Sequence, residues 1–241
     1  MSPIVLDDID EPDVWELIRW MAQRSSDWVL IGGLMVATFD LEYGDPWRQT
    51  HDVDSLFDVR HAARGAIRDH VEELRSVGFE FVANHAGLGH RLVRGNLILD
   101  VLSTDHFPQD PLVSLAPRLE TFQTPGGSQA MKRREAVDVS FRGTVFRLPR
   151  PNLLGAILVK AAASRHANRP KDHRDLAHLV AKVDDPIALR RGIEAHERRL
   201  LAERLTHRLV SAELAAIGRD AATKLRLLAV ETDRGGPVVE P

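Results

Sequence analysis

Two aspartates, Asp52 and Asp54, stand two residues apart in the stretch 47–54, and their spacing suits metal chemistry. In an extended strand, positions i and i+2 point to the same face. The two carboxylates would therefore lie side by side, while Val53 turns into the protein. Paired carboxylates of this kind can hold Mg²⁺ or Mn²⁺, the ions that drive phosphoryl and nucleotidyl transfer.

A pair of glycines, Gly32 and Gly33, precedes these aspartates and supplies a second part of such a site. The apolar run 28–31 predicts a short buried strand that ends at the glycines, and residues 34–41 then predict a helix. Such a turn brings backbone amides close to phosphate oxygens at a helix N-terminus. Gly-Gly alone is often only a tight turn, and Asp-x-Asp alone is common on solvated strands. Their order along this chain favours a metal-phosphate site.

Asp100 is a third carboxylate of interest because it interrupts the apolar run 97–102. A carboxylate in such a strand is costly to bury unless it is paired or binds metal. The alternative is an aspartate at a strand end that a backbone amide or an arginine satisfies. We expect metal ligation, since Asp100 would complete a site of three carboxylates.

Charged residues recur on two expected helices in the stretch 160–179. Lys160 and Arg165 fall on the first helix. Asp172 and Asp175 stand three residues apart on the second helix, and hence on one face. Without further context, all four are ordinary solvated helix charges.

The surrounding patterns indicate an α/β half followed by a helical half. Short apolar strands alternate with helical periodicity up to about residue 107, and two hairpins are expected at Gly95-Asn96 and Arg142-Gly143. The stretch 108–129 is rich in loop residues. Pro149-Arg150-Pro151 marks a boundary. We therefore expect three parts: an α/β domain over 1–149, a helical domain over 150–232 and a flexible tail over 233–241.

Composition excludes several classes of protein. The chain has 241 residues, a net charge of −3 and no cysteine. The missing cysteines exclude disulfides, thiol catalysis and cysteine-ligated zinc, and they fit a cytoplasmic location. The start of the chain lacks the basic region of a signal peptide, and no apolar run approaches the roughly 20 residues of a membrane span. We expect no membrane partner.

Taken together, these residues resemble the DNA polymerase β-type nucleotidyltransferase superfamily. The resemblance covers most of the chain, from about residue 28 to residue 179. Its second half looks most like the AbiEii/MenT-like toxins of type IV toxin–antitoxin systems. The motifs that carry it are Gly32-Gly33, Arg48-x-Thr50-x-Asp52-x-Asp54, Asp100, and Lys160…Arg165…Lys171-Asp172-x-x-Asp175-Leu176.

The resemblance implies a fold and a set of roles. The fold would be a polymerase β-like mixed sheet with helices, followed by a helical domain. The glycines would cradle a triphosphate, and the nucleotide contacts would be Gly32, Gly33, Arg48, Thr50, Lys160 and Arg165. The metal ligands would be Asp52, Asp54 and Asp100. The catalytic set would consist of these three aspartates with Lys160, Asp172 and Asp175.

The activity implied by the resemblance is transfer of NMP from an NTP to a macromolecule. The favoured acceptor is tRNA, and a cognate antitoxin would be the protein partner. One alternative is a nucleotidyltransferase acting on a small molecule of the aminoglycoside kind or on a protein hydroxyl. Another is a non-catalytic module that binds a nucleotide or a partner on the same fold. The three aspartates argue against that module, since binding alone would not require them.

A basic stripe is the candidate contact for an RNA acceptor. Arg60, Arg64 and Arg68 recur every four residues on the helix expected at 61–77, just after the Asp-Val-Asp strand. Phosphate contacts by such a stripe would bring affinity without sequence information. A solvated helix face is the ordinary alternative, and arginines of the C-terminal helices are the next candidates.

Overall fold

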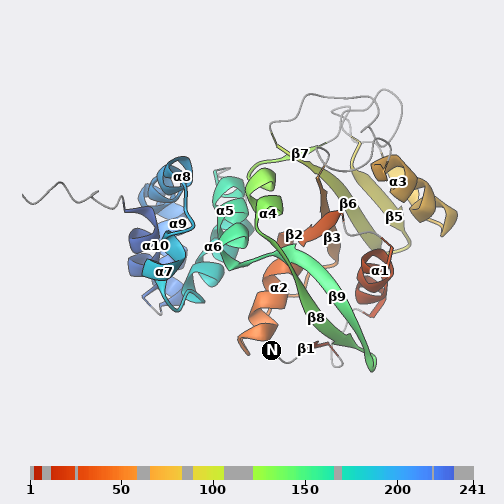
Figure 1. Cartoon of the computed structure of the whole chain (residues 1–241), viewed down its shortest axis with the longest axis horizontal. Coiled ribbons are helices and arrows are strands. Elements are labelled where there is room, and N and C mark those ends of the chain that lie inside the picture. The colour runs from red at the N-terminus through yellow and green to blue at the C-terminus, as the bar shows by residue number, and fades with distance from the viewer. Residues whose placement is uncertain are drawn as a thin grey trace, which may run out of the picture. The chain divides into compact units, whose positions relative to one another are not determined.

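The computed structural model describes residues 3–6, 12–24, 27–58, 66–82, 89–105, 122–165, 170–218 and 220–230. Contacts divide the chain into two compact units, Met1–Ala163 and Ser164–Pro241. The first unit combines helices with mixed sheets, and the described part of the second is helical (Figure 1). This confirms the expected α/β fold with a helical C-terminal part. The first unit extends past the boundary expected at residue 149, and the expected tail lies outside the described residues.

The main sheet runs through the centre of the first unit. In the part of the chain that the structure describes, its order is β2(Trp28–Ile31), β3(Asp52–Phe57), β6(Leu97–Thr104), β5(Arg91–Arg94) and β4(Glu80–Val82), and the short β7(Gln123–Thr124) also pairs with β6. The central pair, β3 and β6, is parallel, and the neighbours β2 and β5 run antiparallel to them. The sheet is therefore mixed, as the sequence predicted, and its central strands carry the aspartates.

A second sheet of the first unit contains β1(Ile4–Val5), β8(Arg134–Phe141) and β9(Thr144–Pro151). Arg142 and Gly143, both with positive φ, turn β8 into β9, and Gly95-Asn96 turns β5 into β6. A two-residue turn with positive φ matches the right-handed twist of the strands that it joins. Both hairpins were predicted from these residue pairs.

Helices cover both faces of the main sheet. Leu56 and Phe57 are neighbours in β3 and therefore point to opposite faces. Leu56 approaches Gly127 at the start of α4(Gly127–Lys132), whereas the ring of Phe57 lies 5.2 Å from that of His70 in α3(Ala66–Ser76). The same His70 ring lies 6.1 Å from Trp20 of α1(Pro12–Ala22). Figure 1 shows α4 to one side of β2, β3 and β6, and α1 and α3 to the other.

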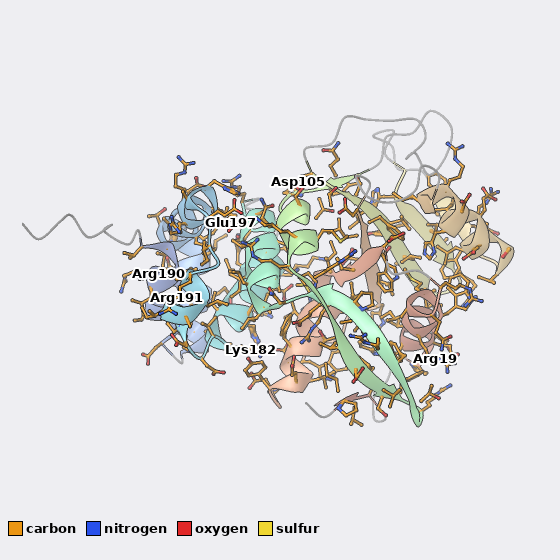
Figure 2. All side chains as sticks on the ribbon, in the orientation of Figure 1. Arg19, Asp105, Lys182, Arg190, Arg191 and Glu197 are labelled. Atoms are coloured by element: carbon orange, nitrogen blue, oxygen red, sulfur yellow. The ribbon has the colours of Figure 1, made fainter. Side chains whose placement is uncertain are left out.

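The helix α4 falls at the end of a stretch that the sequence predicted as loop. Its first turn is held by Asp105, whose two carboxylate oxygens accept hydrogen bonds of 2.8 Å from the backbone amides of Gly126 and Ser128. Figure 2 shows Asp105 beside α4. A carboxylate at this place satisfies amides that have no partner inside the helix. α5(Leu153–Ala163) packs beside α4 and α2(Gly32–Glu42).

The second unit contains α6(Pro170–Ala181), α7(Pro186–Arg190), α8(Ala195–Thr206), α9(Arg208–Ile217) and α10(Ala221–Ala229) within its described residues. Buried leucines at helical spacing form its core, among them Leu176, Leu201, Leu214 and Leu225. Glu194 and Glu197 form a capping box at the start of α8. None of the helices that the structure describes, in either unit, is long and apolar enough to cross a membrane.

Candidate active site

The register of the main sheet brings the three aspartates onto one face. Asp54 is aligned with Asp100 across the parallel pair β3 and β6, and Asp52 lies two residues earlier on β3. Aligned residues of neighbouring strands share a face, and so do residues two apart on one strand. Asp100 is buried, with 7% of its surface exposed, whereas Asp52 and Asp54 are half-buried. The three aspartates therefore project from one face of the sheet, and the metal site predicted for them stays a prediction.

Gly32 brings the start of α2 against one of these carboxylates. It is the first residue of the helix and has a φ of +71°. A Cβ atom added at this position would lie 1.8 Å from Oδ2 of Asp54, so no larger residue fits. The partial positive charge of a helix N-terminus favours a carboxylate there. Asp54 and the predicted Gly-Gly turn thus meet directly.

Gly33 faces two of the residues predicted to contact a nucleotide. A Cβ atom added at Gly33 would lie 3.0 Å from Nη2 of Arg48 and 3.2 Å from Oγ1 of Thr50. A guanidinium, a hydroxyl and the first turn of a helix therefore surround one small residue. Each of these groups is a known type of phosphate ligand. The loop between α2 and β3, which carries Arg48 and Thr50, thus folds back to the start of α2.

Asp100 is paired with Arg91, a residue that the sequence analysis did not select. Nε and Nη2 of Arg91 donate hydrogen bonds of 2.8 Å to the two carboxylate oxygens of Asp100. Arg91 is the partner of Asp100 in the antiparallel pair β5 and β6, and therefore projects from the same face. Of the two interpretations that the sequence left for Asp100, the structure shows pairing with an arginine. Its ligation of a metal stays a prediction.

The sequence contains the information needed to identify Arg91 as the residue opposite Asp100. The hairpin turn at Gly95-Asn96 aligns Arg94 with Leu97, and stepping outward three residues on each strand aligns Arg91 with Asp100. The turn at Gly95-Asn96 was predicted, so the register could have been counted from it.

The three carboxylates of this face interact with one guanidinium. The hydrogen bond to Asp100 is the main cause that raises the pKa of the Arg91 guanidinium above its ordinary value, and the charges of Asp100, Asp52 and Asp54 raise it further. Carboxylate oxygens are ligands that fit Mg²⁺ or Mn²⁺. Within the described ranges, no three His, Asp or Glu side chains already lie close enough together to hold a metal ion.

Comparison with known proteins finds a likeness to solved structures. No protein-family model matches the chain, and no curated protein matches it. The chain is similar to an antigenic nucleotidyltransferase-like protein from Paracoccidioides brasiliensis. The two are 17% identical, 89% of this chain and 92% of that chain are covered, and the TM-score is 0.46. A likeness at this level assigns neither an activity nor a substrate to this chain.

The other predicted site residues divide between the two units. Lys160 lies on α5 in the first unit, together with the aspartates, and is buried. Arg165 lies in the second unit, where its guanidinium is 3.0 Å from the carboxylate of Glu203. Asp172 and Asp175 are buried on α6 of the second unit. The roles predicted for these four residues stay predictions.

The basic stripe is described only in part. Arg60 and Arg64 lie outside the described residues, and Arg68 is exposed on α3. α3 packs through His70 against Phe57, which points to the sheet face opposite Asp54 and Asp52. Arg68 therefore belongs to a helix on the other side of the sheet from the carboxylates. Its contact with RNA stays a prediction.

Proposed function

We propose that this protein is a nucleotidyltransferase that depends on a divalent cation and moves NMP from an NTP to a hydroxyl acceptor. The observation that carries the proposal is the contact between Asp54 and Gly32. It joins a carboxylate pair to a helix start flanked by Arg48 and Thr50. A carboxylate pair that could hold a metal ion thus lies against a helix start that could hold a phosphate.

The chemistry divides between these two parts. The triphosphate would bind at the start of α2, where Arg48 and Thr50 donate hydrogen bonds to its oxygens, and Lys160 is the further cationic contact that we propose. Asp52 and Asp54 would hold the divalent cation, which when bound neutralises charge on the phosphates. The acceptor oxygen forms a bond to the α-phosphorus, and the bond from that phosphorus to the β-phosphate oxygen breaks. Pyrophosphate leaves, and the hydroxyl proton passes to a base.

For the acceptor we propose RNA, with tRNA as the favoured class, and for the biological role a toxin that a cognate antitoxin restrains. This finer assignment is supported by the resemblance of the stretch from Lys160 to Leu176 to the toxin branch of the superfamily. Asp172 and Asp175 would complete the catalytic set in that case. A small molecule and a protein hydroxyl are the competing acceptors.

A transfer assay tests the proposal. The purified full chain is incubated with each of the four α-labelled NTPs, Mg²⁺ or Mn²⁺, and total RNA. We expect label in RNA bands that RNase removes, and no label with the D54N variant, which keeps the shape of the side chain but loses its charge. EDTA should abolish the transfer.

The outcomes separate the alternatives. Label that resists RNase and runs with protein would replace RNA by a protein hydroxyl as the acceptor. Growth in the presence of an aminoglycoside on expression would favour a small-molecule acceptor. Nucleotide binding without metal, and no transfer to any acceptor, would favour the non-catalytic module and overturn the proposal.

A further inference from the structure

Arg91 is the counter-cation of the carboxylate face. Its guanidinium uses two nitrogens, Nε and Nη2, to close a bidentate pair with both oxygens of Asp100. The carboxylate end of the pair is enclosed, with 10% of the Asp100 side chain exposed, whereas the Arg91 side chain is 39% exposed. An ion pair of this geometry is stronger than a single contact, because two parallel hydrogen bonds fix both groups.

Arg91 and a metal ion would compete for the carboxylate oxygens of Asp100. A carboxylate that accepts two hydrogen bonds in its plane has its best ligand positions occupied by the donors. Asp52 and Asp54 lie on the same sheet face as this pair, so a cation bound to them would stand close to both the Asp100 carboxylate and the Arg91 guanidinium. The carboxylate would attract that cation, and the guanidinium would repel it.

We propose that Arg91 is a positioning residue that holds Asp100 in a closed ion pair and releases it when a divalent cation binds at Asp52 and Asp54. The inference rests on the proposed function, because it requires a cation at those two aspartates. In the closed state Arg91 neutralises part of the carboxylate charge. In the metal-bound state Asp100 turns from Arg91 to the cation, and Arg91 becomes available to an anionic group such as a phosphate.

This arrangement predicts whether the affinity for the metal rises or falls when Arg91 is removed. A residue that only supports the shape of the site would weaken metal binding when lost. A residue that competes with the cation would strengthen it, because its positive charge disappears and Asp100 is released. The lost repulsion of a unit charge and the released carboxylate of Asp100 both contribute, and together we expect them to raise the affinity about tenfold.

The test is Mn²⁺ binding to the full chain, followed by the electron paramagnetic resonance signal of the free ion. We expect R91Q to bind Mn²⁺ about tenfold more tightly than the unmodified protein. R91K keeps the charge but cannot form the bidentate pair, so its affinity should lie between the two. In the D100N background the gain from R91Q should shrink to about threefold or less, since Asp100 is then no longer the ligand to be released.

Arg94 provides the matched control. It stands on the same strand, β5, and carries the same charge, but its guanidinium lies over the Phe79 ring and donates to the carbonyl of Val77. R94Q therefore changes the net charge by the same amount as R91Q and should leave the Mn²⁺ affinity unchanged. A similar gain in R94Q would trace the effect to net charge and overturn the role of Arg91.

The outcomes also separate this inference from the proposed function. If the unmodified protein binds Mn²⁺ and R91Q binds it with equal or lower affinity, Arg91 does not compete with the cation and only this inference fails. If none of the variants binds Mn²⁺, the metal site of the proposed function fails as well. Circular dichroism of R91Q and D100N confirms that each comparison is made on folded protein.

Discussion

The carboxylate of Asp54 occupies the space that a side chain at Gly32 would need. An added Cβ would lie 1.8 Å from Oδ2 and 2.6 Å from Cγ of Asp54, on a backbone with φ of +71°. The strand residue and the helix residue are therefore fitted to each other. Any side chain at residue 32 would force Asp54 away from the start of α2.

The first prediction is that G32A abolishes nucleotide transfer. The substitution would displace Asp54, and it also places a Cβ at positive φ, which costs about 1–2 kcal/mol for an L-residue. Gly44 provides the control, because it has a φ of +69° and no atom within 4 Å of an added Cβ. G44A should therefore show the backbone cost alone and keep its activity. Melting temperatures and transfer rates measured for the two variants isolate the contact with Asp54. Equal activity in both would show that this contact has no functional role.

The second prediction concerns the aspartates themselves. D52N and D54N should each reduce transfer to below about a tenth of the unmodified rate, because each removes a charged metal ligand. Their melting temperatures in EDTA check that the protein stays folded when a charge beside the start of α2 and Arg91 is removed. Single-turnover rates and thermal melts check both parts. A variant that keeps most of its activity would remove that residue from the metal site.

The sequence predicted the parts of the site that follow from local rules. The period-2 alternation of β3 put Asp52 and Asp54 on one face, and the pair Gly32-Gly33 marked the turn from β2 into α2. Asp100 was recognised as anomalous in an apolar strand. Its partner Arg91 was not predicted, because the pairing follows from the register counted outward from the Gly95-Asn96 turn and not from the spacing of residues along one strand.

The remaining differences between the sequence predictions and the structure arise from contacts between residues far apart in the chain. The helix α4 begins where the sequence predicted a loop, because the carboxylate that caps it comes from Asp105, 21 residues before Gly126. Pro149-Arg150-Pro151 was interpreted as a domain boundary from its two prolines. The structure instead places Arg150 in the core of the first unit, with 1% of its surface exposed. Glu135 is its partner across the β8–β9 hairpin, but Thr38 and Glu42 come from α2, more than 100 residues earlier, so no local pattern could indicate its burial.

The third prediction is that Arg150 stabilises the first unit. Its guanidinium forms ion pairs with Glu42 and Glu135, donates a 2.9 Å hydrogen bond to Oγ1 of Thr38, and lies 3.8 Å from the centre of the Phe39 ring. R150Q leaves the two carboxylates without their cation and should lower the free energy of unfolding by roughly 3–5 kcal/mol, the range for breaking a buried pair. Urea unfolding measures the loss.

The pH dependence of R150Q gives a second measurement of this cluster. Burial raises the pKa of Glu135 above its ordinary value, and Arg150 opposes that rise. Without the arginine, Glu135 should take up a proton more readily, which relieves part of the penalty as the pH falls. The difference in unfolding free energy between R150Q and the unmodified protein should therefore be larger at pH 7 than at pH 5. A difference that is independent of pH would mean that the lost packing on Phe39 dominates.

The fourth prediction is an acid-sensitive contribution from His70. Burial between Phe57 and Trp20 is the main cause that lowers the pKa of His70 from 6.5 to about 4, and the charge of Arg24 lowers it further. A histidine whose folded pKa lies below its unfolded value contributes stability that is fully present above pH 6.5 and is lost as the pH falls towards 4. The shift corresponds to roughly 3 kcal/mol over this window.

H70L has no proton to bind, so its unfolding free energy should fall less between pH 7 and pH 4.5 than that of the unmodified protein. Urea unfolding gives the free energy of unfolding of both proteins at both pH values. The contributions of the titratable groups that the two proteins share then cancel in the comparison. An equal fall in both would show that His70 stays accessible to protons in the folded state.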